Sequence, residues 1–169
     1  KEEAKKRFRP SKDLRGMKVL VIDDNATSRE ILKDMLESFT FEVTVAASGP
    51  EGITELENAE GKKPFDLIVM DWKMPDMDGI EASRRIKHHP DLKKIPAIIM
   101  VTAYGREEMM QLSEAEGLDG FLIKPVNPSM LFDMIMQVFS KEQRNEPGIS
   151  SRKGQNKEAV QALCGSNIL

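Results

Sequence analysis

The stretch Lys18-Val-Leu-Val-Ile-Asp-Asp24 is a run of Val, Leu and Ile that ends in two adjacent acids. Two other stretches have the same character: Leu67-Ile-Val-Met70 precedes Asp71, and Ala97-Ile-Ile-Met-Val101 precedes Thr102. Runs that are apolar throughout and rich in Val and Ile are typical of strands buried on both faces of a parallel sheet. We therefore expect three central strands, each followed by a polar side chain at its carboxyl end.

Helical patterns alternate with these runs and with two weaker strand-like runs at residues 41–46 and 120–123. Apolar residues recur at helical spacing in residues 31–39 and 130–139, whereas residues 106–116 carry a poor apolar stripe and should form the loosest helix. Five strands alternating with five helices predict one doubly wound α/β domain. The expected helix caps are Ser48, Asp78 and Asn127, with Pro128 at the start of the last helix.

Polar residues follow the predicted strands at one edge of the sheet. The acids are Asp23, Asp24 and Asp71, and the fourth and fifth strands end in Thr102 and Lys124. Each residue alone has an ordinary explanation as a turn, cap, strand-end or solvated residue. Together they form a cluster where ligands bind in open parallel sheets, because the carboxyl ends of all the strands meet there.

The crowding of three carboxylates indicates a bound cation. Two like charges about 4 Å apart repel by ~4 kcal/mol at an effective dielectric constant near 20, and one Lys cannot neutralise three acids. A hard divalent ion with oxygen ligands can, and Mg²⁺ is the expected one. The adjacent His88 and His89 lie near a predicted helix end, away from this edge, so zinc is not expected. With the metal in place, one carboxylate can act as a nucleophile toward phosphorus.

Four motifs surround this cluster: Val19-Leu-Val-Ile-Asp-Asp-Asn25, Met70-Asp-Trp-Lys-Met-Pro-Asp-Met-Asp-Gly79, Val101-Thr-Ala-Tyr-Gly105 and Phe121-Leu-Ile-Lys-Pro125. They resemble the motifs of receiver domains of bacterial two-component systems, over about residues 14–140. The residues of the second and third motifs are most similar to those of receivers of hybrid sensor histidine kinases.

The resemblance implies a flavodoxin-like sheet with strand order 2-1-3-4-5 and a role for each residue of the cluster. Asp71 would be the phosphorylated nucleophile, and Mg²⁺ would bind Asp24, Asp71 and the backbone carbonyl of Lys73, with Asp23 acting through water. The implied phosphoryl-binding residues are Thr102, Ala103 and Lys124, and the peptide bond before Pro125 is expected to be cis.

The resemblance also implies switch residues and partners. Phe121 stands at the position of the family's switch aromatic, with a plain core aromatic as the alternative reading, and Lys73 and Tyr104 would tune the hydrolysis of the phosphoryl group. The expected partner is a kinase or phosphotransfer domain that carries phosphohistidine. A homodimer would form through the fourth and fifth helices.

Composition sets the expected location and excludes some partners. The chain has 25 Lys and Arg against 28 Asp and Glu, so nothing electrostatic favours nucleic acid or an anionic membrane. One cysteine, Cys164, permits no intrachain disulfide, which suits a reducing cytoplasm. No apolar run approaches the ~20 residues of a membrane span, and residues 1–9 lack a signal-peptide core. We expect a cytoplasmic domain, although a longer parent protein could be membrane-anchored elsewhere.

Composition also divides the chain into segments. We expect a charged N-terminal linker at residues 1–13, the receiver domain at 14–140 and a flexible linker at 141–162. The stretch Leu163-Cys-Gly-Ser-Asn-Ile-Leu169 repeats the pattern of Leu14-Arg-Gly-Met-Lys-Val-Leu20. Residues 163–169 therefore predict the start of a second receiver domain, with a chance match as the alternative.

Three other functions remain to be weighed. An aspartyl-nucleophile phosphatase usually carries a second Asp two positions after the first, whereas Lys73 follows Asp71 here. A non-phosphorylated interaction module would not require the complete set of acids, Thr and Lys. A DNA-binding regulator would need a basic recognition helix, and none follows residue 140. We expect a receiver that catalyses its own phosphorylation and dephosphorylation without being a turnover enzyme, within a parent histidine kinase.

Overall fold

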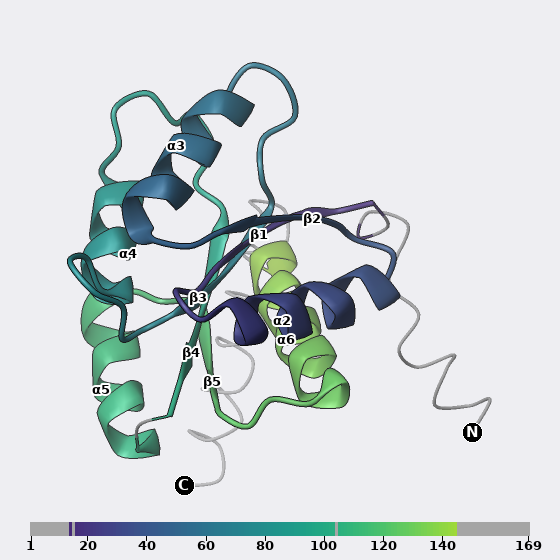
Figure 1. The fold of residues 1–169 in the computed structure, drawn as a ribbon, viewed down its shortest axis with the longest axis vertical. Coiled ribbons are helices and arrows are strands. Elements are labelled where there is room, and N and C mark those ends of the chain that lie inside the picture. Colours follow the sequence, from purple (N-terminus) through teal and green to yellow (C-terminus); the bar gives the residue numbers. More distant parts are fainter. Residues whose placement is uncertain (1–13, 15, 104, 145–169) are drawn as a thin grey trace, which may run out of the picture. The chain divides into compact units, whose positions relative to one another are not determined.

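The computed structural model describes residue 14 and residues 16–103 and 105–144. The chain divides into two compact units, residues 1–134 and residues 135–169. All five strands and the first four helices lie in the first unit, and the last helix begins there (Figure 1).

Five parallel strands form one sheet in the order β2-β1-β3-β4-β5, which confirms the predicted fold class and strand order. The central strands are short and apolar because both faces of the sheet are covered. The strands are β1 (Lys18–Ile22), β2 (Glu42–Ala46), β3 (Leu67–Asp71), β4 (Ala97–Thr102) and β5 (Gly120–Ile123). The helices are α2 (Ala26–Ser38), α3 (Gly49–Ala59), α4 (Gly79–Lys87), α5 (Arg106–Glu116) and α6 (Pro128–Arg144).

Helix α2 lies on one face of the sheet, and α3, α4 and α5 cover the other (Figure 1). Leu20 and Ile22 on β1, together with Ile68 and Met70 on β3, belong to a core cluster that includes residues of α3, α4 and α5. The alternate residues of these strands are also buried and point to the opposite face. Each buried Val, Leu or Ile contributes roughly 1.5–3 kcal/mol relative to an exposed one, so this double-sided core holds the strand ends in place.

The strand register brings the carboxyl ends of the central strands together. Ile22 pairs with Met70, and Asp71 pairs with Val101. Asp23, Asp71 and Thr102 therefore follow one another across neighbouring strands at the same edge.

The predicted helix caps are confirmed. Ser48 accepts a hydrogen bond from the N–H of Glu51, Asp78 accepts one from Glu81, and Asn127 accepts one from Met130. These side chains satisfy N–H groups that the first turn of a helix leaves without partners. The caps fix where α3, α4 and α6 begin after the loops that follow the strands.

Helix α5 is less firmly packed than its neighbours. Met109 is its one buried residue, and Gly105 at its N-terminus makes no side-chain capping bond. Its C-terminal end is better held: Gly117 has a left-handed backbone with φ of 67°, and the Lys87 ammonium of α4 donates to the carbonyl of Glu116 at 2.6 Å. The weaker end of α5 is therefore the one that follows Thr102.

Helix α6 continues to Arg144, past residue 140 where the linker was expected to begin. The predicted segments at residues 1–13 and 163–169, and the rest of the linker, lie outside the described residues. No helix in the described part of the chain is long and apolar enough to cross a membrane.

Candidate functional site

Three carboxylates converge at the carboxyl edge of the sheet. Asp23 and Asp24 follow β1, and Asp71 ends β3. One oxygen from each of the three lies within 4.8 Å of the others. Asp23 is fully buried and Asp71 is 8% exposed, whereas Asp24 is exposed to solvent. The sequence-predicted acidic cluster is therefore a compact group open on the side of Asp24.

Lys124 directly follows β5, and its ammonium group lies beside two of these carboxylates. Its Nζ lies 3.3 Å from Asp71 Oδ1 and 3.8 Å from Asp23 Oδ2. The main-chain N–H of Lys124 donates to the carbonyl of Thr102 at 2.7 Å, and its peptide bond to Pro125 is cis. Lys124 thus reaches two of the acids from a backbone position tied to the end of β4.

Burial and crowding shift the acids toward their protonated forms. Burial is the largest cause that raises the pKa of Asp23, and Lys124 opposes this rise. Burial also raises the pKa of Asp71, the charge of Asp23 raises it further, and Lys124 again acts in the opposite direction. A single ammonium is therefore insufficient to offset the cost of holding both carboxylates in the ionised form.

The donor set fits a hard divalent cation. Asp23 Oδ2 is buried and has no hydrogen-bond partner among the described residues, which is costly for a charged oxygen unless an ion or water satisfies it. All three converging side chains offer oxygen atoms, the ligands that Mg²⁺ prefers. A cation bound between them would offset the repulsion that raises the pKa values.

A family model for the response regulator receiver domain matches residues 19–136. The chain belongs to this family. The receiver is 32% identical over 127 residues to the chemotaxis protein CheY-3 of Vibrio cholerae, an alignment that covers 75% of this chain and 95% of that protein. The match confirms the resemblance drawn from the motifs and makes the chain a receiver domain of the two-component type.

Solved structures agree with this assignment. The receiver resembles the signal receiver domain of a signal transduction histidine kinase from Syntrophus aciditrophicus, with 30% identity and a TM-score of 0.62 over 78% of this chain and 96% of that one. It also resembles a chain of the CheX-CheY-BeF3-Mg²⁺ complex from Borrelia burgdorferi. There the identity is 26% and the TM-score 0.68, over 79% of this chain and 96% of that one.

The other predicted site residues of the receiver differ in their exposure to solvent. Thr102 is buried at the end of β4, and Ala103 after it is exposed. Phe121 is partly buried and packs against the core cluster. Lys73 is exposed and its Nζ lies 4.2 Å from the centre of the Trp72 ring. Tyr104 lies outside the described residues.

Gly79 has a structural role at the site that sequence reasoning missed. A Cβ atom there would lie 2.6 Å from the main-chain oxygen of Asp71 and 2.6 Å from Met100 Sδ. The N–H of Gly79 donates to the carbonyl of Trp72 at 2.7 Å. Gly79 therefore allows α4 to begin directly against the residue that ends β3. The Asp78-Gly79 pair signals a turn or cap in the sequence, but not this close approach.

Asn25 was also missed as a site residue. Its main-chain N–H donates to Asp23 Oδ1 at 2.9 Å, while its side chain caps α2 by accepting the N–H of Ser28 at 2.9 Å. The turn from β1 into α2 thereby holds one oxygen of Asp23 and leaves Oδ2 facing Lys124. An Asn after two acids is a recognisable capping signal, although its bond to Asp23 depends on the folded turn.

Proposed function

We propose that the receiver accepts a phosphoryl group on Asp71 from a phosphohistidine in a partner protein, in a reaction that depends on Mg²⁺. The observation that carries this proposal is the position of Asp71, which shares one cation-sized space with Asp23 and Asp24 while Lys124 lies 3.3 Å from its Oδ1. Mg²⁺ bound beside Asp71 would favour its ionised, nucleophilic form, and Lys124 lies where its ammonium can bind a phosphoryl oxygen.

The transfer forms one bond and breaks one. A carboxylate oxygen of Asp71 attacks the phosphorus, the P–N bond to the donor imidazole breaks, and the nitrogen keeps the electron pair and gains a proton. Lys124 offsets negative charge on an equatorial oxygen, and the Thr102 hydroxyl and Ala103 N–H donate to the others. Bound Mg²⁺ supplies further charge neutralisation at these oxygens.

We assign the cation to Asp24 and Asp71 directly, with the backbone carbonyl of Lys73, and to Asp23 through a water molecule. The buried Asp23 Oδ2, which has no hydrogen-bond partner among the described residues, supports this assignment. The raised pKa values of Asp23 and Asp71 support it as well, since they indicate that the acids lack sufficient positive charge.

Phosphorylation switches the receiver through the weakly held N-terminal end of α5. A phosphoryl group adds about −1.5 to −2 charges and strong hydrogen-bond acceptors, and Thr102 and Lys124 reorganise around it. Because α5 follows Thr102 and buries Met109 alone, it is the element that these bonds can move at the least cost. Phe121 acts as the switch aromatic, and Lys73 and Tyr104 tune the lifetime of the phosphorylated state.

We infer that the parent protein is a hybrid sensor histidine kinase in the cytoplasm, with the receiver at residues 14–140 and linkers on either side. The residues of the second and third motifs support this inference, as does the likeness to the receiver domain of a histidine kinase from Syntrophus aciditrophicus. A homodimer forms through the fourth and fifth helices, α5 and α6, where Met110 is an exposed apolar side chain.

We expect that the receiver does not turn over small phosphate esters. The exposed Lys73 stands two positions after Asp71, where a phosphatase of this chemistry would place an acid and base. Steady release of phosphate from small esters would instead identify an aspartyl-nucleophile phosphatase.

The test is phosphorylation with a small phosphodonor, acetyl phosphate, with MgCl₂ or with excess EDTA. We expect the intact mass to rise by one phosphoryl group with Mg²⁺ alone, and peptide mapping to locate the group on the peptide that contains Asp71. Absence of modification with Mg²⁺ would favour a non-phosphorylated interaction module, and modification at another residue would refute the assignment of Asp71.

A further inference from the structure

Arg29 holds the backbone on both sides of Asp24. Its guanidinium Nη1 donates to the main-chain carbonyl of Asp23 at 2.7 Å, and its main-chain N–H donates to the carbonyl of Asn25 at 3.0 Å. The second bond is the regular backbone bond of the first turn of α2, so the guanidinium contact to the Asp23 carbonyl is the one that depends on the Arg29 side chain. That carbonyl belongs to the peptide group that precedes Asp24, so its orientation influences the direction of the exposed Asp24 side chain.

Asp23 is held by the same arrangement. Its N–H donates to Ala46 of β2 at 3.2 Å, its Oδ1 accepts the N–H of Asn25 at 2.9 Å, and its carbonyl accepts from Arg29. With the main chain and one carboxylate oxygen fixed, Oδ2 is the atom left to face Asp71 and Lys124. Without the Arg29 guanidinium, the buried carbonyl of Asp23 would lose a charge-assisted hydrogen bond, and the turn would be linked to α2 through Asn25 without this bond from Arg29.

We propose that Arg29 is a positioning residue for the cation site, which fixes the turn at residues 23–25 so that the acids of β1 face the acid of β3. The proposal rests on the proposed function, because it requires that Asp24 and Asp71 bind Mg²⁺. Arg29 fixes the turn through its hydrogen bond to the main-chain carbonyl of Asp23 and does not contact the cation itself.

The charge of Arg29 and its positioning role have opposite effects on cation binding. The positive charge of a guanidinium close to the site repels Mg²⁺, so removing that charge should strengthen Mg²⁺ binding. Burial is the largest cause that raises the pKa of Asp23, and Arg29 is among the charges that oppose this rise. Loss of positioning should weaken Mg²⁺ binding, because contacts that orient metal ligands typically contribute ~10–100-fold to metal affinity. The sign of the change distinguishes the two roles.

The experiment is a titration of the full 169-residue chain with MgCl₂, followed by the fluorescence of Trp72. Trp72 is the single tryptophan of the chain and directly follows Asp71, so it reports on the site without any phosphorylation. Wild type is compared with Arg29→Met, which removes both charge and donor, and with Arg29→Lys, which keeps the charge and one donor group. Lys33→Met is the matched control, because Lys33 is on α2 one turn further along and loses the same charge.

We expect Arg29→Met to weaken Mg²⁺ binding by ~10-fold, Arg29→Lys to restore most of the affinity, and Lys33→Met to leave it within about 2-fold. Mg²⁺ binding that is unchanged or tighter in Arg29→Met would overturn the positioning role and leave the proposed function intact. A wild-type chain that shows no Mg²⁺ response would overturn both.

Stability is controlled separately. Urea unfolding without Mg²⁺ shows whether each variant is folded before the titration. If Arg29→Met does not fold, Arg29→Gln removes the charge with a smaller change in polarity and gives the same test of sign: weaker Mg²⁺ binding supports positioning, and tighter binding contradicts it.

Discussion

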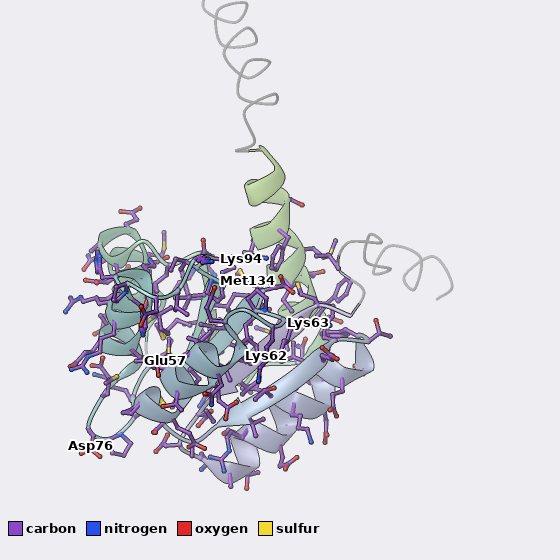
Figure 2. All side chains as sticks on the ribbon, turned by 90° about the horizontal axis from the view of Figure 1, so that it is seen from above. Glu57, Lys62, Lys63, Asp76, Lys94 and Met134 are labelled. Atoms are coloured by element: carbon purple, nitrogen blue, oxygen red, sulfur yellow. The ribbon has the colours of Figure 1, made fainter. Side chains whose placement is uncertain are left out.

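The two edges of the sheet use the same kinds of charged residue in opposite ways. At the carboxyl edge, Asp23 and Asp71 are buried and share Lys124. At the amino edge, Glu42 pairs with Lys63 at 2.7 Å and Asp66 with Lys94 at 2.8 Å, each acid with its own cation and each pair in contact with solvent. Figure 2 shows Lys63 and Lys94 well apart from Asp76, which belongs to the loop that follows Asp71.

The acids respond to these two environments in opposite directions. Burial raises the pKa of Asp23 and of Asp71, whereas the hydrogen bond and charge of Lys63 lower the pKa of Glu42. Lys63 thus favours the ionised form of Glu42, whereas burial at the carboxyl edge disfavours the ionised forms of Asp23 and Asp71. The fold keeps an unfavourable arrangement at the carboxyl edge, where the binding of a cation or a phosphoryl group can relieve it.

The largest difference between the edges should appear in phosphoryl acceptance. Asp71→Asn replaces the carboxylate that we propose attacks phosphorus with an amide, so we expect no phosphorylation of this variant by acetyl phosphate with Mg²⁺. Asp66→Asn changes an acid of the amino edge in the same way and should be phosphorylated to the same extent as wild type, as measured by intact mass. Equal phosphorylation of both variants would mean that the acceptor is elsewhere.

The lysines of the two edges should differ in their effect on stability. Lys124→Met leaves two buried acids without their shared cation, so we expect it to lower the free energy of unfolding in Mg²⁺-free buffer by about 1–2 kcal/mol. Lys94→Met breaks an exposed pair and should cost less than ~0.5 kcal/mol. Urea denaturation of both variants checks this, and equal losses would contradict the contrast between the edges.

The raised pKa of Asp71 predicts a pH-dependent stabilisation by Asp71→Asn. An acid whose pKa is higher in the folded than in the unfolded state lowers stability at pH 7, and this cost disappears as the pH falls through the folded-state pKa. Without Mg²⁺, Asp71→Asn should therefore stabilise the receiver at pH 7, by on the order of 1 kcal/mol, and stabilise it less as the pH falls toward the ordinary Asp pKa of 3.8.

Urea unfolding of both proteins at pH 7 and pH 5 measures this difference. Glu42 contributes stability that is lost as the pH falls from its ordinary pKa of 4.5 toward its lowered pKa, and it is present in both proteins, so its contribution cancels. A gain that grew as the pH fell would show that the pKa of Asp71 is lowered in the folded protein.

The smallest expected effect concerns backbone strain at the amino edge of the sheet, beside the start of β2. Thr40 connects α2 to β2 with φ of 72°, a left-handed conformation that a β-branched residue adopts at a cost. Thr40→Asn should raise the melting temperature through a gain of up to ~1 kcal/mol, with no change in phosphorylation. A gain in stability accompanied by altered phosphorylation would indicate that the two ends of the sheet are coupled.

The fold and the acidic edge were predictable because they depend on patterns that the chain displays locally. The Val- and Ile-rich runs mark buried parallel strands, and the residue after each run must lie at the carboxyl edge. Asp23, Asp71 and Lys124 come together for that reason, although a hundred residues separate the first from the last.

The contacts that refine the site were not predictable, because they depend on loop geometry. The bond from Arg29 to the Asp23 carbonyl requires that α2 start at a particular angle to β1. The close approach of Gly79 to the Asp71 backbone requires the path of the loop between β3 and α4. At the amino edge, away from the site, the pairing of Lys63 with Glu42 likewise arises from a loop and a strand that only the folded sheet brings together.

The most direct test of the central claim is a crystal structure of the chain grown with Mg²⁺ and beryllofluoride, the pair present in the similar CheX-CheY complex. We predict one Mg²⁺ bound by the carboxylates of Asp24 and Asp71, with beryllofluoride on Asp71 and Lys124 against its fluorine atoms. An Asp71 carboxylate turned away from Asp23 and Asp24, or Mg²⁺ bound elsewhere, would contradict the account.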